Sequence, residues 1–79
     1  MEPVGEVLDK FSELLADTTV PRNIKSRIED IMGVLKEKKE LSIKVNKALN
    51  DLDEIASDVN LQQYTRTQLW NIISMLEKL

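Results

Sequence analysis

Two pairs of carboxylates come closer than any other residues of this chain to the spacing of a chemical site. Glu13 and Asp17 are four residues apart, and so are Glu54 and Asp58. On a helix such residues share a face, where their oxygens could bind a divalent cation. The chain has no histidine, no cysteine and no calcium-loop pattern. We therefore expect these acids to form ion pairs and predict no metal site.

Lys25 and Arg66 are the expected partners of these acids. The two basic residues are equivalent when the sequence is compared with itself at an offset of 41 residues. We expect Glu13 to pair with Lys25, and Glu54 to pair with Arg66, close to two reversals of the chain. Partly exposed pairs contribute only about 0–1 kcal/mol each, so their role would be structural.

Catalysis is disfavoured by the residue types. Histidine is the commonest general base and metal ligand, and the chain has none. Its serine and threonine hydroxyls have no histidine to activate them, and no glycine-rich loop could bind phosphate. We predict a protein that is not an enzyme and needs no cofactor.

Trp70 is the most informative residue for binding. On a helical wheel it lies about 130° from the apolar stripe of the last helix, beside Arg66, Ile73 and Glu77. Trp70 either closes the flank of the fold or anchors a contact with another protein, where tryptophan and arginine are enriched. The second interpretation makes this flank an interaction surface, for a homodimer or an unidentified protein partner.

A basic corner gives a second candidate surface. It runs from Lys36 to Lys47 and comprises Lys36, Lys38, Lys39, Lys44 and Lys47. The net charge is −3 overall, but residues 22–47 carry +4. Glu37 and Glu40 interrupt the lysines, and no aromatic residue lies among them, so nucleic-acid binding is the less favoured interpretation. We favour a solvated helix end and keep a nucleic-acid-associated accessory role as the alternative.

Four amphipathic helices must position these residues. The chain is 42% hydrophobic with only three aromatic residues, which indicates an aliphatic, all-α core. Apolar residues recur with helical spacing in four segments. The predicted helices span residues 3–16, 21–38, 41–56 and 61–78.

The connections between these helices repeat. The 41-residue offset aligns Asp17 with Asp58, which indicates a duplicated helical hairpin. We predict that Asp17 accepts hydrogen bonds from N–H groups at the start of the next helix, while Pro21 enters its first turn. At the second corner Asp58 and Asn60 supply the turn-forming side chains.

Two hairpins, about residues 3–38 and 41–79, must bury their apolar faces against each other. We predict one domain over residues 1–79, an antiparallel up-and-down four-helix bundle. The alternative is a two-unit HEAT-like stack, which would bury less surface.

Several segments resemble one family. Residues 17–25 read DTTVPRNIK, residues 52–55 read LDEI, and Arg66-Thr67 precede Trp70. In these features the chain resembles the archaeal uncharacterised protein family 0147. The resemblance implies a small all-helical cytoplasmic protein without an assigned activity. The sequence departs from the family at Val59 and Gln62, where family members have proline.

The location and the function follow as expectations. The start of the sequence has no basic segment followed by an apolar run, and no apolar stretch reaches the roughly 20 residues that cross a bilayer. We expect a cytoplasmic protein without a membrane partner. Its predicted function is that of a protein-interaction or scaffold module.

Overall fold

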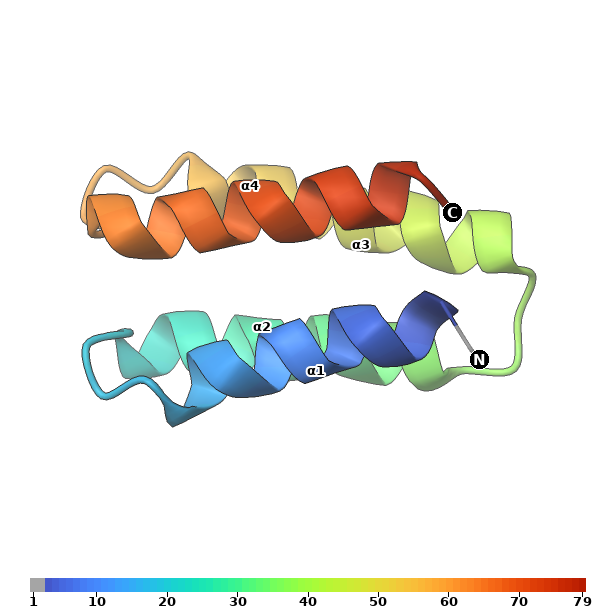
Figure 1. The fold of residues 1–79 in the computed structure, drawn as a ribbon, viewed down its shortest axis with the longest axis horizontal. Helices are drawn as coiled ribbons and strands as arrows, with labels where there is room; N and C mark the ends of the chain where they lie inside the picture. The colour runs from blue at the N-terminus through green and yellow to red at the C-terminus, as the bar shows by residue number, and fades with distance from the viewer. Residues whose placement is uncertain (1–2) are drawn as a thin grey trace.

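The computed structural model describes residues 3–79, which form four α-helices (Figure 1). They are α1 (Pro3–Ala16), α2 (Arg22–Lys36), α3 (Leu41–Ala56) and α4 (Gln63–Glu77). The corner after α1 and the corner after α3 lie at one end of the molecule, and the connection between α2 and α3 lies at the other (Figure 1). None of these helices is long and apolar enough to cross a membrane.

The helices pack in a closed ring. Helix α1 packs against α2 and α4, and α3 packs against the same two helices, while within residues 3–79 the backbones of the diagonal pairs do not come close to each other. A HEAT-like stack would instead place α1 on α3 and α2 on α4. The prediction of an all-α bundle is therefore confirmed, and the ring excludes the alternative stack for this chain.

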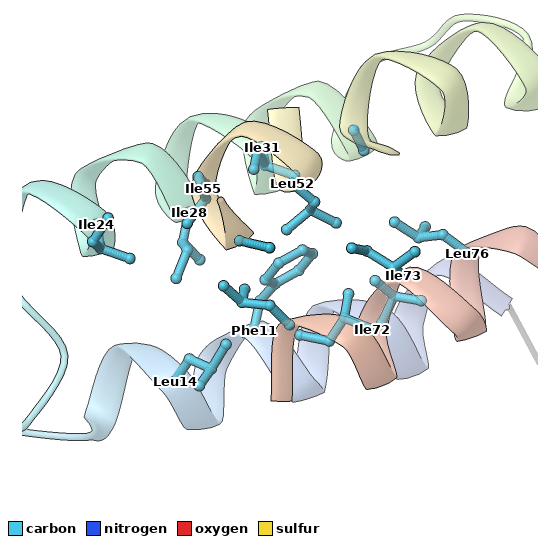
Figure 2. Close-up of a cluster of buried hydrophobic side chains, with 14 of the residues drawn as sticks. Phe11, Leu14, Ile24, Ile28, Ile31, Leu52, Ile55, Ile72, Ile73 and Leu76 are labelled. Atoms are coloured by element: carbon cyan, nitrogen blue, oxygen red, sulfur yellow. The ribbon is translucent and has the colours of Figure 1, made fainter. Parts of the chain in front are cut away.

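The core is aliphatic except for Phe11. Figure 2 shows the Phe11 ring in the middle of the bundle, with side chains from the other three helices around it. Phe11, Ile28, Leu52, Ile55 and Leu69 are all fully buried. Burial of a large apolar side chain is worth about 1.5–3 kcal/mol. These five residues come from all four helices, so their burial stabilises the packing of all four.

The helix boundaries agree with the predictions for α1 and α3 and differ for the other two helices. Helix α2 begins at Arg22 and ends at Lys36, and α4 begins at Gln63 and ends at Glu77. Val20 and Leu61 lie outside the helices, yet they are 4% and 6% exposed. Each corner therefore buries one apolar residue in the core before the next helix begins. Leu61 fits the apolar spacing of α4 without being helical, which is why the predicted helix begins too early.

Thr65 is the one polar residue among the buried side chains of residues 3–79. It is 1% exposed, and its hydroxyl has no hydrogen-bond partner in the described chain. An unsatisfied buried polar group costs about 1–3 kcal/mol, and an apolar group of the same shape avoids that cost. We expect Thr65→Val to raise the free energy of unfolding by about 1 kcal/mol, as measured by urea denaturation.

Thr67→Val is the matched control, because Thr67 is exposed on the same helix. It should change the free energy of unfolding by less than about 0.5 kcal/mol. Destabilisation by Thr65→Val would show that the hydroxyl has a partner in solution.

Candidate functional site

The two corners have the same backbone. The Thr19 N–H donates to Asp17 Oδ1 at 2.8 Å, and the Asn60 N–H donates to Asp58 Oδ1 at 2.8 Å. The residues before the helices also match, since Pro21 has φ −58° and ψ 148° and Gln62 has φ −66° and ψ 148°. The repeat seen in the sequence therefore holds at the level of hydrogen bonds.

The role predicted for Asp17 and Pro21 needs correction. Asp17 accepts hydrogen bonds from the N–H and the hydroxyl of Thr19, inside the turn, and makes none to the start of α2. These bonds, with a smaller contribution from the charge of Lys25, lower the pKa of Asp17. Pro21 precedes the first helical residue, Arg22, and does not enter the first turn. The Asp side chain is too short to span the corner, so it fixes the turn locally.

The expected ion pairs are not those in the structure. Glu13 Oε2 lies 3.8 Å from Lys10 Nζ on its own helix. Glu54 Oε2 lies 2.9 Å from Arg27 Nη2 and so links α3 to α2. The sequence placed these acids near the corners but could not show which neighbouring helix would present a cation to them.

Arg66 has a different role from the one predicted. Its Nε donates to the Ala56 carbonyl at 3.1 Å, and its Nη2 donates to the Asp58 carbonyl at 2.7 Å. The Ala56 carbonyl is the last of α3 and is one that the helix itself leaves unpaired. The Asp58 carbonyl lies in the following turn and also accepts from the Leu61 N–H. Arg66 therefore caps the end of α3, where its guanidinium is engaged.

The equivalence of the corners leads to a prediction at Gln62. Pro21 shows that the shared backbone conformation accepts proline. Proline at a compatible position reduces the entropy of the unfolded chain and stabilises by about 0.4–1 kcal/mol. We expect Gln62→Pro to raise the thermal midpoint by a few degrees, measured by circular dichroism. Gln62→Ala is the control and should give no gain, and a lower midpoint for Gln62→Pro would contradict the equivalence.

The outer face of α4 is unlike that of the other helices. Its exposed residues are Gln63, Tyr64, Thr67, Trp70, Asn71, Ser74 and Glu77, of which only Glu77 is charged. The exposed residues of α1, by contrast, include Glu6, Asp9, Lys10 and Glu13. The centres of protein interfaces are depleted in charge and enriched in tryptophan and tyrosine. The outer face of α4 combines this scarcity of charge with Trp70, and no other helix covers it.

Trp70 lies at the centre of this face. It is 49% exposed, so it does not close the flank of the bundle. The predicted surface also needs correction at Ile73, which is 6% exposed and belongs to the core. Glu77 is exposed at the end of the helix.

Without Arg66 and Ile73, the exposed surface is one stripe along α4, which we term the α4 stripe. Its residues follow one another at intervals of four and three positions. It consists of Gln63, Thr67, Trp70, Ser74 and Glu77. Three of these residues, Gln63, Thr67 and Ser74, were not predicted to belong to a surface. The available signal was the scarcity of charge, since the α4 sequence contains only Arg66 and Glu77 as charged residues.

The basic corner is exposed, with all of its lysines outside the core. Lys39 pairs with Glu37 at 2.9 Å, and Lys47 pairs with Asp51 at 3.1 Å. Four of them, Lys36, Lys38, Lys39 and Lys44, line a groove together with three leucines and a valine. As for metal chemistry, no three acidic side chains come together across residues 3–79 in a way that could hold an ion.

Comparison with known proteins gives a consistent result. A model of the family described as "Uncharacterised protein family (UPF0147)" matches residues 2–79. A UPF0147 protein of Methanocaldococcus jannaschii is 46% identical over 69 residues, which cover 86% of this chain and 74% of that protein. A UPF0147 protein of Thermoplasma volcanium is 40% identical over 95% of this chain and 85% of its own length.

Solved structures agree with the fold. The crystal structure of a protein from UPF0147 of Thermoplasma acidophilum has a TM-score of 0.91 and 35% identity, and covers 96% of this chain and 91% of that one. The crystal structure of a protein of unknown function, MMP1188, has a TM-score of 0.90 and 36% identity, with 98% and 89% coverage. The same bundle is therefore found in experimental structures.

Proposed function

Since the chain belongs to the uncharacterised family UPF0147, which offers no activity to transfer, we propose from its own surface that it is a non-enzymatic interaction module acting through the α4 stripe. The observation that carries this proposal is the half-exposed Trp70 in the middle of a face with a single charge at its end. Tryptophan in such a setting is the residue type most often found as an interface hot spot. The lack of histidine and cysteine supports a role without catalysis.

A second copy of the chain is the occupant that the α4 stripe fits best. Trp70 is the midpoint of Gln63–Glu77. If two α4 helices cross antiparallel with a two-fold axis at Trp70, Thr67 faces Ser74 of the other copy and Gln63 faces Glu77. The one charge on the stripe then meets an amide donor and not another carboxylate. The stripe is thus self-complementary, as an isologous interface requires.

The experiment is sedimentation equilibrium of the full chain at concentrations up to about 1 mM. We expect a dimer, and we expect Trp70→Ala to raise the dissociation constant at least about 30-fold, the loss typical of a hot spot of 2 kcal/mol. Tyr64→Ala is the matched control, because Tyr64 is 61% exposed on the same helix but off the stripe. It should leave the dissociation constant unchanged.

The antiparallel register has its own test. Thr67→Glu combined with Ser74→Glu places like charges opposite each other and should abolish the dimer. Thr67→Arg combined with Ser74→Glu places opposite charges there and should retain it. A monomer at 1 mM, or equal behaviour of the two double variants, would contradict the proposed occupant.

The alternative function, a nucleic-acid accessory role, would use the basic corner. Four of its five lysines are exposed and Lys44 is partly buried, but Lys39 pairs with Glu37 and Lys47 pairs with Asp51. Salt-sensitive retention of the chain on RNA, lost on charge reversal of Lys38 and Lys39, would support this alternative.

A further inference from the structure

A groove with a volume of about 500 Å³ lies where α1, the end of α2 and the start of α3 meet. Its floor is apolar and consists of Val4, Leu8, Leu35 and Leu41. Leu35 is buried, Val4 and Leu8 are partly buried, and Leu41 is 39% exposed. The end of the bundle opposite the two corners therefore has an open apolar depression.

Lysines form the rim of this groove. They are Lys36, Lys38, Lys39 and Lys44, and Glu37 lies among them. Lys39 is bound to Glu37, whereas Lys36, Lys38 and Lys44 have no carboxylate within 4 Å among residues 3–79. We term the floor and rim together the lysine groove. Its net charge is positive although the chain as a whole is acidic.

The apolar surface continues beyond the groove along α3. Ile43 is 54% exposed and lines a smaller depression that shares Lys39 and Lys44 with the lysine groove. Exposed aliphatic side chains lie here beside lysines without a carboxylate partner, so the surface can bind both apolar and anionic groups. An apolar side chain would be buried on the floor, while an anionic group would meet the rim.

We propose that the lysine groove binds an acidic amphipathic helix of a protein partner. Leucine-type side chains on one face of such a helix would enter the floor, and its flanking glutamates or aspartates would meet Lys36, Lys38 and Lys44. This is the helix-in-groove mode of recognition. It complements both the charge and the hydrophobicity of the groove, and it is independent of the α4 stripe.

The chemistry of the groove distinguishes this occupant from a nucleic acid or a membrane. Nucleic-acid bases require aromatic or arginine side chains for stacking, and the groove is lined by neither. The leucines of the floor would make no favourable contact with charged phosphate groups. An anionic bilayer is a flat surface, whereas the floor of the groove is a depression that reaches the buried Leu35.

The test uses a synthetic amphipathic peptide with leucines at i, i+3, i+4 and i+7 and glutamates elsewhere. Binding to the full-length chain is followed by ¹⁵N–¹H chemical shifts and fluorescence anisotropy. We expect saturable binding with the largest shifts within residues 35–44. The double variant Lys38→Glu and Lys44→Glu should weaken binding at least tenfold, and so should Leu41→Ser, which removes apolar surface without changing charge.

Arg22→Glu combined with Lys10→Glu is the matched control, because it makes the same change in net charge away from the groove. The dissociation constant of the peptide should stay within about twofold of its value for the unmodified chain, and Trp70→Ala should have the same small effect. Circular dichroism checks that each variant is folded.

Four results would overturn the proposal. They are no saturable binding, equal affinity for a peptide in which glutamine replaces glutamate, no effect of Leu41→Ser, and tighter binding of the groove to a 20-nucleotide RNA or to phosphatidylglycerol vesicles than to the peptide. The RNA and vesicle results would reassign the groove to those partners.

Discussion

Phe11→Ala is expected to lower the free energy of unfolding by about 3–5 kcal/mol, the usual loss when a buried phenylalanine is truncated. Phe11 is 0% exposed and lies between all four helices (Figure 2). A domain of 79 residues has a total stability of about 4–12 kcal/mol. The substitution should therefore remove a large part of the stability, and the measurement is urea denaturation monitored by circular dichroism.

The control for this prediction is Leu15→Ala. Leu15 lies on the same helix, one turn further along, and is only partly buried. Its truncation should cost clearly less than that of Phe11. A loss below about 1 kcal/mol for Phe11→Ala would show that the other side chains collapse into the space, and that no single residue organises the bundle.

Arg66→Ala is expected to lower the free energy of unfolding by about 2–3 kcal/mol. The guanidinium donates to the carbonyls of Ala56 and Asp58, and hydrogen bonds that involve a charged group are worth about 1.5–3 kcal/mol. After the change the Ala56 carbonyl would depend on water, while the Asp58 carbonyl would keep only the Leu61 N–H. The measurement is again the free energy of unfolding in urea.

The internal repeat supplies the control for Arg66. Lys25 occupies the equivalent position at the first corner, where it makes no hydrogen bond to the end of α1 within residues 3–79. Lys25→Ala should therefore cost less than about 0.5 kcal/mol. Equal losses at the two positions would contradict the capping role and would point to a general effect of positive charge at a helix start.

The fold could be predicted because it depends on periodicity. The apolar spacing in residues 41–56 gives the limits of α3 directly, and Phe11 lies on the predicted stripe of α1. Antiparallel packing then follows from the short connections. The start of α4 was misplaced because Leu61 is apolar and buried without being helical, a distinction that periodicity cannot make.

The site was predicted less well, for reasons of side-chain reach. Trp70 was identified from its position on the helical wheel, and it is exposed. Arg66 and Ile73 lie beside it on the wheel, but one turns back to the end of α3 and the other points into the core. The neighbouring helices decide whether a side chain at the edge of an apolar stripe points into the core or toward solvent. A helical wheel of one helix carries no information about those neighbours.

Exchanging the first hairpin with the second leaves the ring of packed helices unchanged. The contact between α1 and α4 becomes the contact between α3 and α2, and both contacts are present in the bundle. One hairpin sequence, present twice, would satisfy both positions. The bundle is therefore accessible to a shorter ancestor that assembled from two identical half-length chains. A fusion of two such chains would need to add only the segment between α2 and α3, after which equivalent positions such as those of Lys25 and Arg66 could come to differ.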